Sequence, residues 1–252
     1  MDIPVRIVLV ETSHPGNVGA VARAMKTMGL DELCLVAPKS FPDAEATARA
    51  SGADDILARA RIESDLPAAI GDCSYVVGAS ARTRGGRWPV IDPKACALRI
   101  AARLPDEVVA IVMGPEQAGL TNDDLARCHD LVHIPTAPEY GSLNLAMAAQ
   151  VLCYELRMAM LAQSNGKRAA AIPEQREAPP ATAAEIEGFQ GQLEALLTQS
   201  GFLRPDHPHQ LRRKLRRLFM RAELDRNEVN ILRGALNSLR PGGSSSWRDI
   251  DD

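Results

Sequence analysis

The sequence is poor in aromatic residues and carries no net positive charge. Its 252 residues include four Phe, two Trp and three Tyr, and 29 Lys and Arg stand against 32 Asp and Glu. A surface that stacks many nucleic-acid bases needs many aromatic side chains, so such a platform is not expected. The net charge of −3 also gives no overall sign of a nucleic-acid partner. Any basic surface must therefore be local.

Cysteine is scarce and unclustered. The five cysteines form no Cys-x-x-Cys pair, and the five histidines show no metal-ligand spacing with them. The pattern therefore predicts neither a disulfide framework nor a metal site. Free thiols of this kind are typical of a reducing cytoplasm.

Long apolar runs are missing too. No stretch of 18 or more consecutive apolar residues occurs, so we expect no membrane span. The first residues, Met-Asp-Ile-Pro-Val-Arg, lack the basic region and apolar stretch of a signal peptide. These features predict a cytoplasmic location. The dinucleotide fingerprint Gly-x-Gly-x-x-Gly is not met either, which disfavours a nucleotide-dependent oxidoreductase.

What the sequence does contain is an alternation of two kinds of segment. Short apolar runs predict strands at 6–10, 33–37, 75–78, 108–113 and 131–134. Helical patterns lie between and after them, at 18–28, 44–50, 66–70, 93–103, 123–128 and 143–163. This alternation predicts a parallel α/β sheet with helices on both sides.

The composition changes at Ser164. Residues 1–163 form the predicted α/β domain, and residues 164–182 combine Pro, Gly, Ala and charges as a linker does. Three helical patterns follow in a predicted extension, 183–240. The Gly- and Ser-rich end, 241–252, is expected to be a disordered tail.

Three glycine-containing segments stand at predicted strand ends or helix starts. They are Glu11–Lys26, Met113–Leu120 and Tyr140–Ala146. Glycine lets a loop bring its backbone close to a ligand, and strand ends are where such loops gather. Three of them in one domain predict a single composite pocket.

Together these segments resemble the three motifs of the SPOUT (class IV) S-adenosylmethionine-dependent RNA methyltransferases. Motif one is Asn17, Gly19 and Arg23, motif two is Gly114-Pro115-Glu116 with Gly119, and motif three is Ser142 and Asn144. The resemblance covers residues 6–161. Within this family, the sequence most resembles the branch that methylates the ribose 2'-hydroxyl of cytidine or uridine at position 32, in the tRNA anticodon loop.

The resemblance implies a SPOUT fold with a C-terminal trefoil knot, a homodimer, tRNA as partner and S-adenosylmethionine as methyl donor, with no metal. It places donor binding at Ala79, Ser80, Ala81, Gly114, Ile134, Gly141, Ser142 and Leu143. Ala79 departs from the Thr expected there, so one hydroxyl contact is lost.

The resemblance also assigns catalytic roles to Arg23, Asn17, Glu116, Ser142 and Asn144. From the residues alone, each has a plainer alternative. Arg23 lies opposite the apolar face of its helix, where it is either a surface residue or a substrate contact. A guanidinium has a pKa above about 12, so orienting a phosphate or stabilising an alkoxide is easier to defend than a role as base.

For the other motif residues the alternatives are structural. Asn17 either occupies a turn or positions the ribose, and Glu116 either fixes a loop or contacts RNA. Ser142 and Asn144 either cap the helix that follows or serve the site.

A local basic segment completes the pattern. Residues 204–221 hold six Arg and one Lys against a single acidic residue, Asp206, a local charge of about +6. Its helix places Leu211, Leu215, Leu218 and Ala222 on one side. We expect RNA contacts from Arg23, Arg82, Arg84, Arg212, Arg213 and Arg216. The plain alternative for the basic helix is a solvated charged face.

Two rival functions remain open. A related enzyme acting on ribosomal RNA shares the same motifs, and the helical extension favours the tRNA branch over it. A non-catalytic RNA-binding module of the same fold is the second, and the intact motif residues disfavour it.

Overall fold

The computed structural model describes residues 3–81, 89–164, 178–203 and 208–239. Two of the predicted RNA-binding residues, Arg82 and Arg84, lie outside the described residues. So do the predicted tail, 241–252, and most of the predicted linker. The predicted domain boundaries stay predictions.

The described strands form one seven-stranded sheet in which every pairing is parallel, in the order β3-β2-β1-β6-β4-β7-β5. They span Val5–Val10 (β1), Leu33–Val36 (β2), Arg61–Glu63 (β3), Tyr75–Ala79 (β4), Val90–Ile91 (β5), Val109–Met113 (β6) and Asp130–Val132 (β7). The predicted parallel α/β fold is confirmed. The short strands β3 and β5 were not predicted, and the trefoil knot stays a prediction.

Within the described residues of the α/β domain there are seven helices. They span Pro15–Met28 (α1), Ala44–Ala50 (α2), Asp54–Arg59 (α3), Leu66–Ile70 (α4), Pro93–Arg103 (α5), Asn122–Leu125 (α6) and Leu145–Ser164 (α7). Three more form the extension: Ala183–Gln199 (α8), Pro208–Ala222 (α9) and Arg226–Ser238 (α10). Helix α3 was not predicted.

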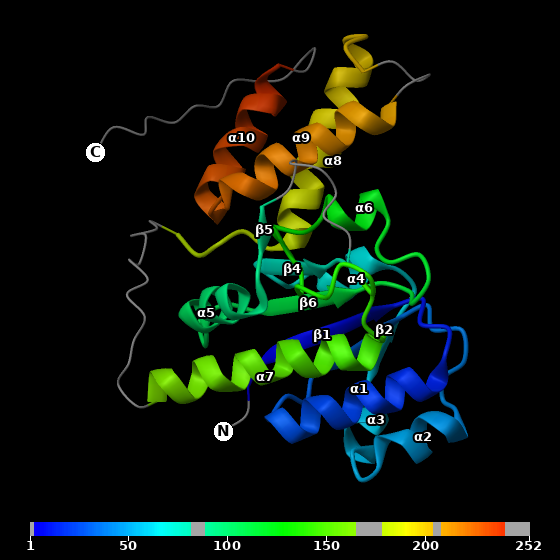
Figure 1. Ribbon diagram of the computed structural model, residues 1–252. Coiled ribbons are helices and arrows are strands. Elements are labelled where there is room, and N and C mark those ends of the chain that lie inside the picture. The colour runs from blue at the N-terminus through cyan, green and yellow to red at the C-terminus, as the bar shows by residue number, and fades with distance from the viewer. Residues whose placement is uncertain (1–2, 82–88, 165–177, 204–207, 240–252) are drawn as a thin grey trace.

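Alternate residues of the strands point to two separate cores. Ile7 and Leu9 of β1 face the core covered by α1, α5 and α7, whereas Val8 and Val10 face the core covered by α4 and α6. The layers are visible in Figure 1, where α7 and α1 lie together on one side of the sheet. A parallel sheet covered on both faces needs apolar side chains on both, which explains its continuous apolar strands.

Helix α1 begins three residues before its predicted start. Pro15 occupies the first turn, where its missing N–H costs no hydrogen bond, and Gly29 ends the helix with φ 81°. A Cβ on Gly19 would overlap the backbone carbonyl of Ala46 in α2. This motif-one glycine therefore serves the close packing of two helices rather than the approach of a ligand.

Helix α7 is long and apolar enough to cross a membrane by length and composition. The helix contains no unbroken apolar run of 18 residues and meets this criterion through its average hydropathy. One such helix is weak evidence for a span, since core helices pass the same test. Its buried side, which includes Leu152 and Leu156, joins the core with α1 and α5.

The extension has a small core of its own. Phe189 of α8 and Phe219 of α9 meet edge to face, with ring centroids 4.7 Å apart. Met220 and Val229 are buried beside them. Leu218, on the predicted apolar side of α9, is half exposed, whereas Leu211 and Leu215 on the same side are half buried. The helix turns its Phe219 and Met220 side inward because these side chains complete the core with Phe189.

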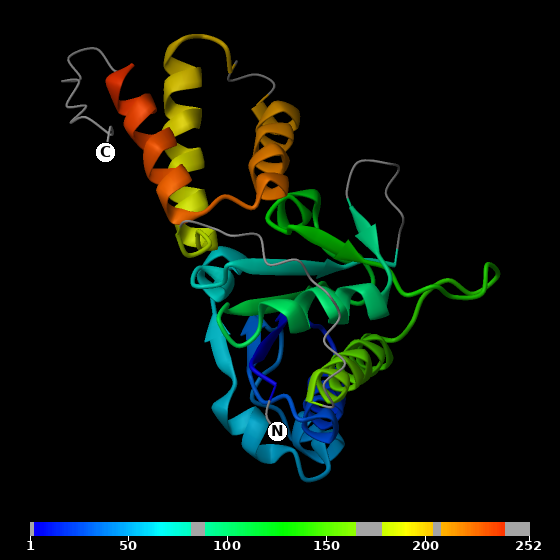
Figure 2. The ribbon, with the colours of Figure 1, turned by 90° about the vertical axis from the view of Figure 1, so that its left-hand side faces the viewer.

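Backbone hydrogen bonds join the extension to the α/β domain. Ala183 and Ala184 at the start of α8 donate to the carbonyls of Cys73 and Gly71, at 2.8 and 2.9 Å. Figure 2 shows the three helices standing on one end of the α/β domain. We call this contact region the seam.

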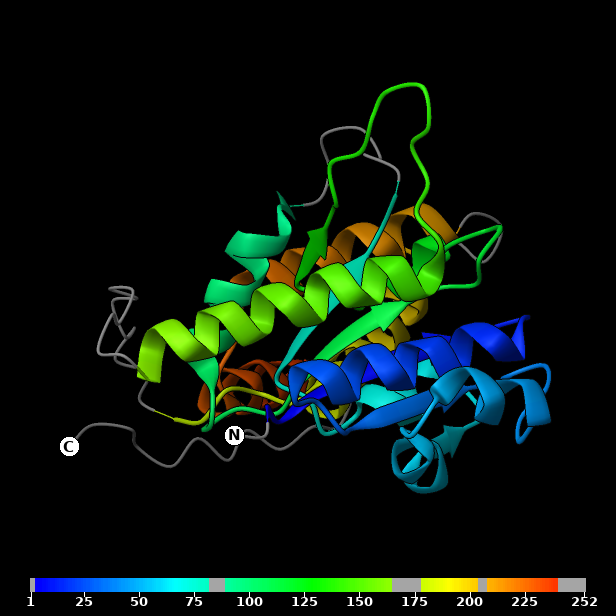
Figure 3. The same ribbon diagram turned by 60° about the horizontal axis from the view of Figure 1, so that its bottom comes forward.

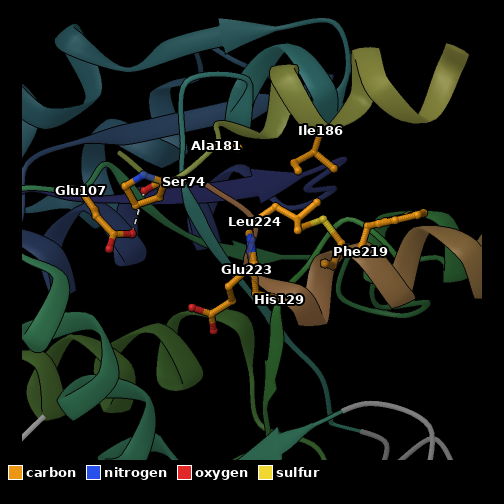
Figure 4. A pocket seen from close by; sticks show the side chains of 10 residues that line it. Ser74, Glu107, His129, Ala181, Ile186, Phe219, Glu223 and Leu224 are labelled. Carbon is orange, nitrogen blue, oxygen red and sulfur yellow. Dashed lines mark hydrogen bonds between the residues drawn. The ribbon is translucent and has the colours of Figure 1, made fainter. Parts of the chain in front are cut away.

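The seam encloses a small cavity of about 10 Å³, room for about one water molecule. Figure 4 shows Ser74, Glu107 and His129 on its α/β side and Ile186, Phe219 and Glu223 on its helical side. Ser74 donates a hydrogen bond to Glu107 at 2.9 Å. Polar groups of the two parts therefore face one another across the seam.

Candidate active site

The order of the strands brings the three glycine-containing segments together. Segment one follows β1 and segment two follows β6, which are neighbours in the sheet. Strands β2 and β3 lie on one side of β1, and the later strands lie on its other side, beginning with β6. Because the sheet is parallel, the carboxyl ends of β1 and β6 lie at the same edge. Crevices at such switch points are the usual ligand sites of open α/β sheets.

Glu116 of segment two is the centre of a hydrogen-bond cluster. Its carboxylate accepts hydrogen bonds from the backbone N–H and the hydroxyl of Ser13, at 3.1 and 2.8 Å. It also accepts from the backbone N–H of His14 at 3.3 Å and from Nδ2 of Asn17 at 2.8 Å. Of the two predicted roles, the structure favours the loop-fixing one: Glu116 binds segment one to segment two.

These contacts determine the charge state of Glu116. Partial burial opposes ionisation, but hydrogen bonds from Asn17, from its own backbone and from Ser13 outweigh it. They lower the pKa of the carboxyl to about 2. Glu116 is therefore a carboxylate at neutral pH and has no proton to donate.

Asn17 extends the cluster to segment three. Its Oδ1 accepts a hydrogen bond from Nδ2 of Asn144 at 2.9 Å. Asn144 Oδ1 in turn accepts from the N–H of Ala146, in the first turn of α7, at 2.9 Å. Asn144 thus caps the helix, which is one of its two predicted roles, and also joins motif three to motif one. Its pairing with Asn17 fixes both amide orientations.

A cavity of about 380 Å³ lies beside this cluster. It is lined by Ala79, Ser80, Ala81, Met113, Gly114, Pro115, Glu116, Gly119, Val132, Ile134, Thr136, Tyr140, Gly141, Ser142, Leu143, Asn144, Leu145 and Ala148. All eight residues predicted to bind the donor are among them. The predicted donor-binding set did not include Thr136, which the strand and helix pattern left in a loop, or Tyr140, the first residue of segment three.

One wall of the cavity is the connection between β7 and α7. This segment, residues 133–144, extends away from the body of the molecule in Figures 2 and 3. Tyr140 near its tip is 81% exposed. Residues 137–144 of this loop are all exposed.

Gly114 shapes its own loop, and two other motif residues lie outside the cavity lining. A Cβ on Gly114 would overlap the backbone of Gly119 and Leu120, so this glycine lets its own loop fold tightly. Arg23 is exposed on α1 and is not part of the cavity lining, and neither is Asn17. The outward direction expected for Arg23 is what the structure has.

Three arginines of α9 form ion pairs within the chain. Arg213 pairs with Asp123 of α6 at 2.7 Å, and Arg216 forms a two-point pair with Glu187 of α8. Arg212 lies 3.4 Å from Glu194. Their partners are 18 or more residues away in sequence, which is why the charge pattern alone could not reveal these pairs.

No group of three or more His, Cys, Asp or Glu in the described ranges is arranged to hold a metal ion. The five cysteines are free and buried. Burial raises the pKa of Cys96 and Cys153 to about 12. Such thiols are poor nucleophiles at neutral pH.

Comparison with known families decides the relationship. Residues 4–154 match the SpoU rRNA Methylase family, and residues 184–247 match the family "tRNA methyltransferase TrmJ, C-terminal domain". The chain belongs to the SpoU methylase family, in its TrmJ branch. Both the cavity domain and the helical extension are therefore parts of one known architecture.

Individual relatives agree with this family. The chain is 52% identical over 235 residues to the tRNA (cytidine/uridine-2'-O-)-methyltransferase TrmJ of Cronobacter sakazakii, covering 93% of this chain and 95% of the relative. The crystal structure of TrmJ from Z. mobilis ZM4 is similar with a TM-score of 0.81 and 35% identity, over 93% of this chain and 98% of that one.

A probable methylase family protein from Haemophilus influenzae Rd KW20 is also similar, with a TM-score of 0.62 and 44% identity. The match covers 94% of this SpoU-family chain and 96% of the other. These similarities span the helices α8, α9 and α10 as well as the sheet. The predicted family membership is confirmed.

Proposed function

We propose that the protein transfers a methyl group from S-adenosylmethionine to the ribose 2'-hydroxyl of a cytidine or uridine at position 32 of tRNA. One observation carries the proposal: Glu116, Asn17 and Asn144 join all three motifs beside a cavity at the strand ends. The chain that holds this arrangement is 52% identical to TrmJ over nearly its whole length.

The cavity suits S-adenosylmethionine. Its volume of about 380 Å³ lies within the usual range of about 300–1,000 Å³ for small-molecule sites. Ala79, Val132 and Ile134 offer an apolar surface for an adenine ring, while Ser80 and Ser142 offer polar groups. When bound, the donor supplies a methyl group on a positively charged sulfur, which is already activated for transfer.

The protein's own task is to align the ribose oxygen and to handle one proton. We assign to Arg23 the orientation of a substrate phosphate and the stabilisation of negative charge on the 2'-oxygen. Ser142 contacts substrate or donor from the cavity wall. Asn17, Glu116 and Asn144 hold these loops in place, and no metal takes part.

A homodimer fits the surface of α7. Met147, Tyr154, Met158 and Leu161 are each 38% exposed or more on this helix. A row of large apolar side chains on one helix is suited to burial against a partner. The assignment of a dimer and of a cytoplasmic location forms part of the proposal.

The extension is assigned to tRNA binding. Lys214 and Arg221 of α9 are exposed, and Arg212 and Arg213 lie on the same helix within reach of a phosphate that displaces their carboxylate partners. Arg82 and Arg84, which follow Ala81 in the sequence, complete the proposed RNA surface. Binding through phosphates weakens steeply as salt rises.

The deciding experiment uses labelled S-adenosylmethionine, unmodified tRNA transcripts and mapping of the methylated nucleotide. Label on the ribose at position 32 supports the proposal. Arg23→Ala is expected to abolish transfer while leaving a folded protein, and Arg23→Lys separates charge from guanidinium geometry. Full activity of Arg23→Ala would remove Arg23 from the reaction.

A second target is favoured by one similar structure. The chain resembles, at 25% identity and a TM-score of 0.51, a protein solved under the description "Structural insights into the 2-OH methylation of C/U34 on tRNA". Label at position 34 would select this alternative. Label only on ribosomal RNA would give the chain the function in the SpoU family's name, and no label on either would favour a binding module.

The RNA surface has its own test. Exchanging Lys214 and Arg221 for Glu is expected to weaken tRNA binding about tenfold or more in low salt and to reduce the salt dependence. The matched control is Lys94→Glu, which reverses the charge of an exposed residue of α5. Unchanged affinity of the α9 variant would exclude that helix from the surface.

A further inference from the structure

Ser80 lies in the cavity wall, and both its backbone N–H and its backbone carbonyl contact residues at the end of β7. Its N–H donates to the carbonyl of Val132 at 3.0 Å. Its carbonyl oxygen lies 3.1 Å from Nδ1 of His133. The first of these continues the pairing of β4 with β7, whereas the second is a side-chain contact that no strand pairing supplies.

His133 stands directly behind the cavity. Its neighbours Val132 and Ile134 line the cavity, and His133 itself does not. Its own N–H donates to the carbonyl of Ile91 at 3.0 Å, so its backbone is fixed by β5. The imidazole, half buried, therefore joins the loop after β4 to the end of β7 from the side away from the ligand.

The contact determines where the imidazole proton lies. A carbonyl oxygen can only accept a hydrogen bond, so Nδ1 must carry hydrogen for the contact to be attractive. The neutral Nδ1–H tautomer and the imidazolium both meet this requirement.

We infer that His133 is a positioning residue of the methyl-donor cavity. It fixes the carbonyl of Ser80 and thereby the position of the Ser80–Ala81 wall opposite Ile134. It touches neither donor nor RNA and acts through Ser80. The inference rests on the proposed function, because it takes S-adenosylmethionine as the occupant of the cavity.

Amide side chains provide a geometric test. The Nδ2 of asparagine sits near the place of the imidazole Nδ1, whereas the amide of glutamine reaches the place of Nε2. His133→Asn is therefore expected to keep the hydrogen bond to Ser80, and His133→Gln and His133→Leu are expected to lose it. The full-length chain is used in each case, with thermal unfolding to confirm that each variant is folded.

The readouts are the Kd for S-adenosylmethionine by calorimetry and the steady-state kcat and KM with tRNA transcripts. We expect Kd and the donor KM to rise about 5- to 30-fold in His133→Leu and His133→Gln, and by less than about 3-fold in His133→Asn. The kcat at saturating donor is expected to change less than about 3-fold in all three. These bounds follow from the loss of one partly buried hydrogen bond.

Three outcomes would overturn the inference. They are an unchanged Kd in His133→Leu, an equal loss in the Asn and Leu variants, or a fall in kcat with an unchanged donor KM. If the unsubstituted protein binds no S-adenosylmethionine, the proposed function itself fails. If it binds the donor and the variants bind equally well, only the role of His133 fails.

Discussion

Arg103 of α5 lies against Glu223, which follows α9, with 2.7 Å between Nη2 and Oε2. The same guanidinium stacks over the ring of Tyr75, 3.9 Å from its centroid. Glu223 has a left-handed backbone, with φ 46°, a conformation that non-glycine residues adopt at a cost. One arginine thus connects the central part of the α/β domain to the extension across the seam.

Removing the carboxylate should weaken this connection. We expect Glu223→Ala to lower the free energy of unfolding by about 1–2 kcal/mol, because the Arg103 side chain is only 16% exposed and would lose its nearest anion. Glu223→Gln keeps an acceptor and should cost less. Urea denaturation of both variants measures this difference, and equal stability of the Ala variant and the parent would contradict it.

The seam should also weaken in mild acid because of His129. Its Nδ1 accepts a hydrogen bond from the N–H of Val76 at 3.0 Å. Burial, partly offset by Glu223, lowers the pKa of this imidazole to about 4, against about 6.5 unfolded. The unfolded chain therefore takes up the proton first as pH falls, and stability is lost between about pH 6.5 and 4.

The expected loss from pH 7 to 5 is roughly 2 kcal/mol from this group alone. His129→Asn keeps an acceptor near Nδ1 and cannot titrate in this range. Its stability should change less between the two pH values than that of the parent. Parallel pH profiles of the two proteins, measured by urea denaturation, would rule out this role for His129.

Glycine at position 19 is predicted to be required for folding rather than for chemistry. Gly19→Ala places a methyl group on the Ala46 carbonyl, so α1 and α2 must separate. We expect a loss of about 2–3 kcal/mol, as for an overpacked core. Gly188→Ala is the matched control: it lies inside α8 with open space around it and should stabilise by about 0.5–1 kcal/mol.

Glu116→Gln tests whether segments one and two are held together by the carboxylate. The amide would present a donor to Asn17 or Ser13, which already donate to this position. We expect a loss of about 1–2 kcal/mol at pH 7 and weaker donor binding. Because the folded pKa is lowered to about 2, the advantage of the parent should shrink as pH falls from about 4.5 towards 2.

Donor affinity measured beside stability separates two possibilities for Glu116. A variant with parental stability and parental donor affinity would show that the cluster is dispensable. Loss of transfer alone, with both other quantities unchanged, would return Glu116 to the RNA contact that the sequence also permitted.

The sequence predicted the elements whose signals are local. Bounds of α2, α4 and α5 agree with prediction, since Asp43, Asp65 and Asp92 cap these helices and mark their starts. The family resemblance supplied the cavity residues. Proximity of β1 and β6 could not be derived from periodicity, because a strand inserted out of order leaves no mark on the pattern.

Side-chain pairs between residues far apart in the sequence could not be predicted. Arg6 is a buried charge on the central strand β1. It pairs with Asp72, which is 66 residues away in the sequence. The pairs of Arg213 and Arg216 with carboxylates were likewise out of reach, because these partners lie on α6 and α8. A charge pattern gives the net charge of a segment, and only the fold shows which side chains that segment contacts.

The place of β6 between β1 and β4 has a consequence for synthesis on the ribosome. Until Val109–Met113 has emerged, β1 is paired only with β2, and β4 lacks both of its neighbours, so about the first hundred residues cannot complete the central sheet on their own. During that interval apolar strand edges of β1 and β4 stay unpaired, a condition that invites aggregation. A nascent chain halted before β6 is therefore the form most in need of a chaperone.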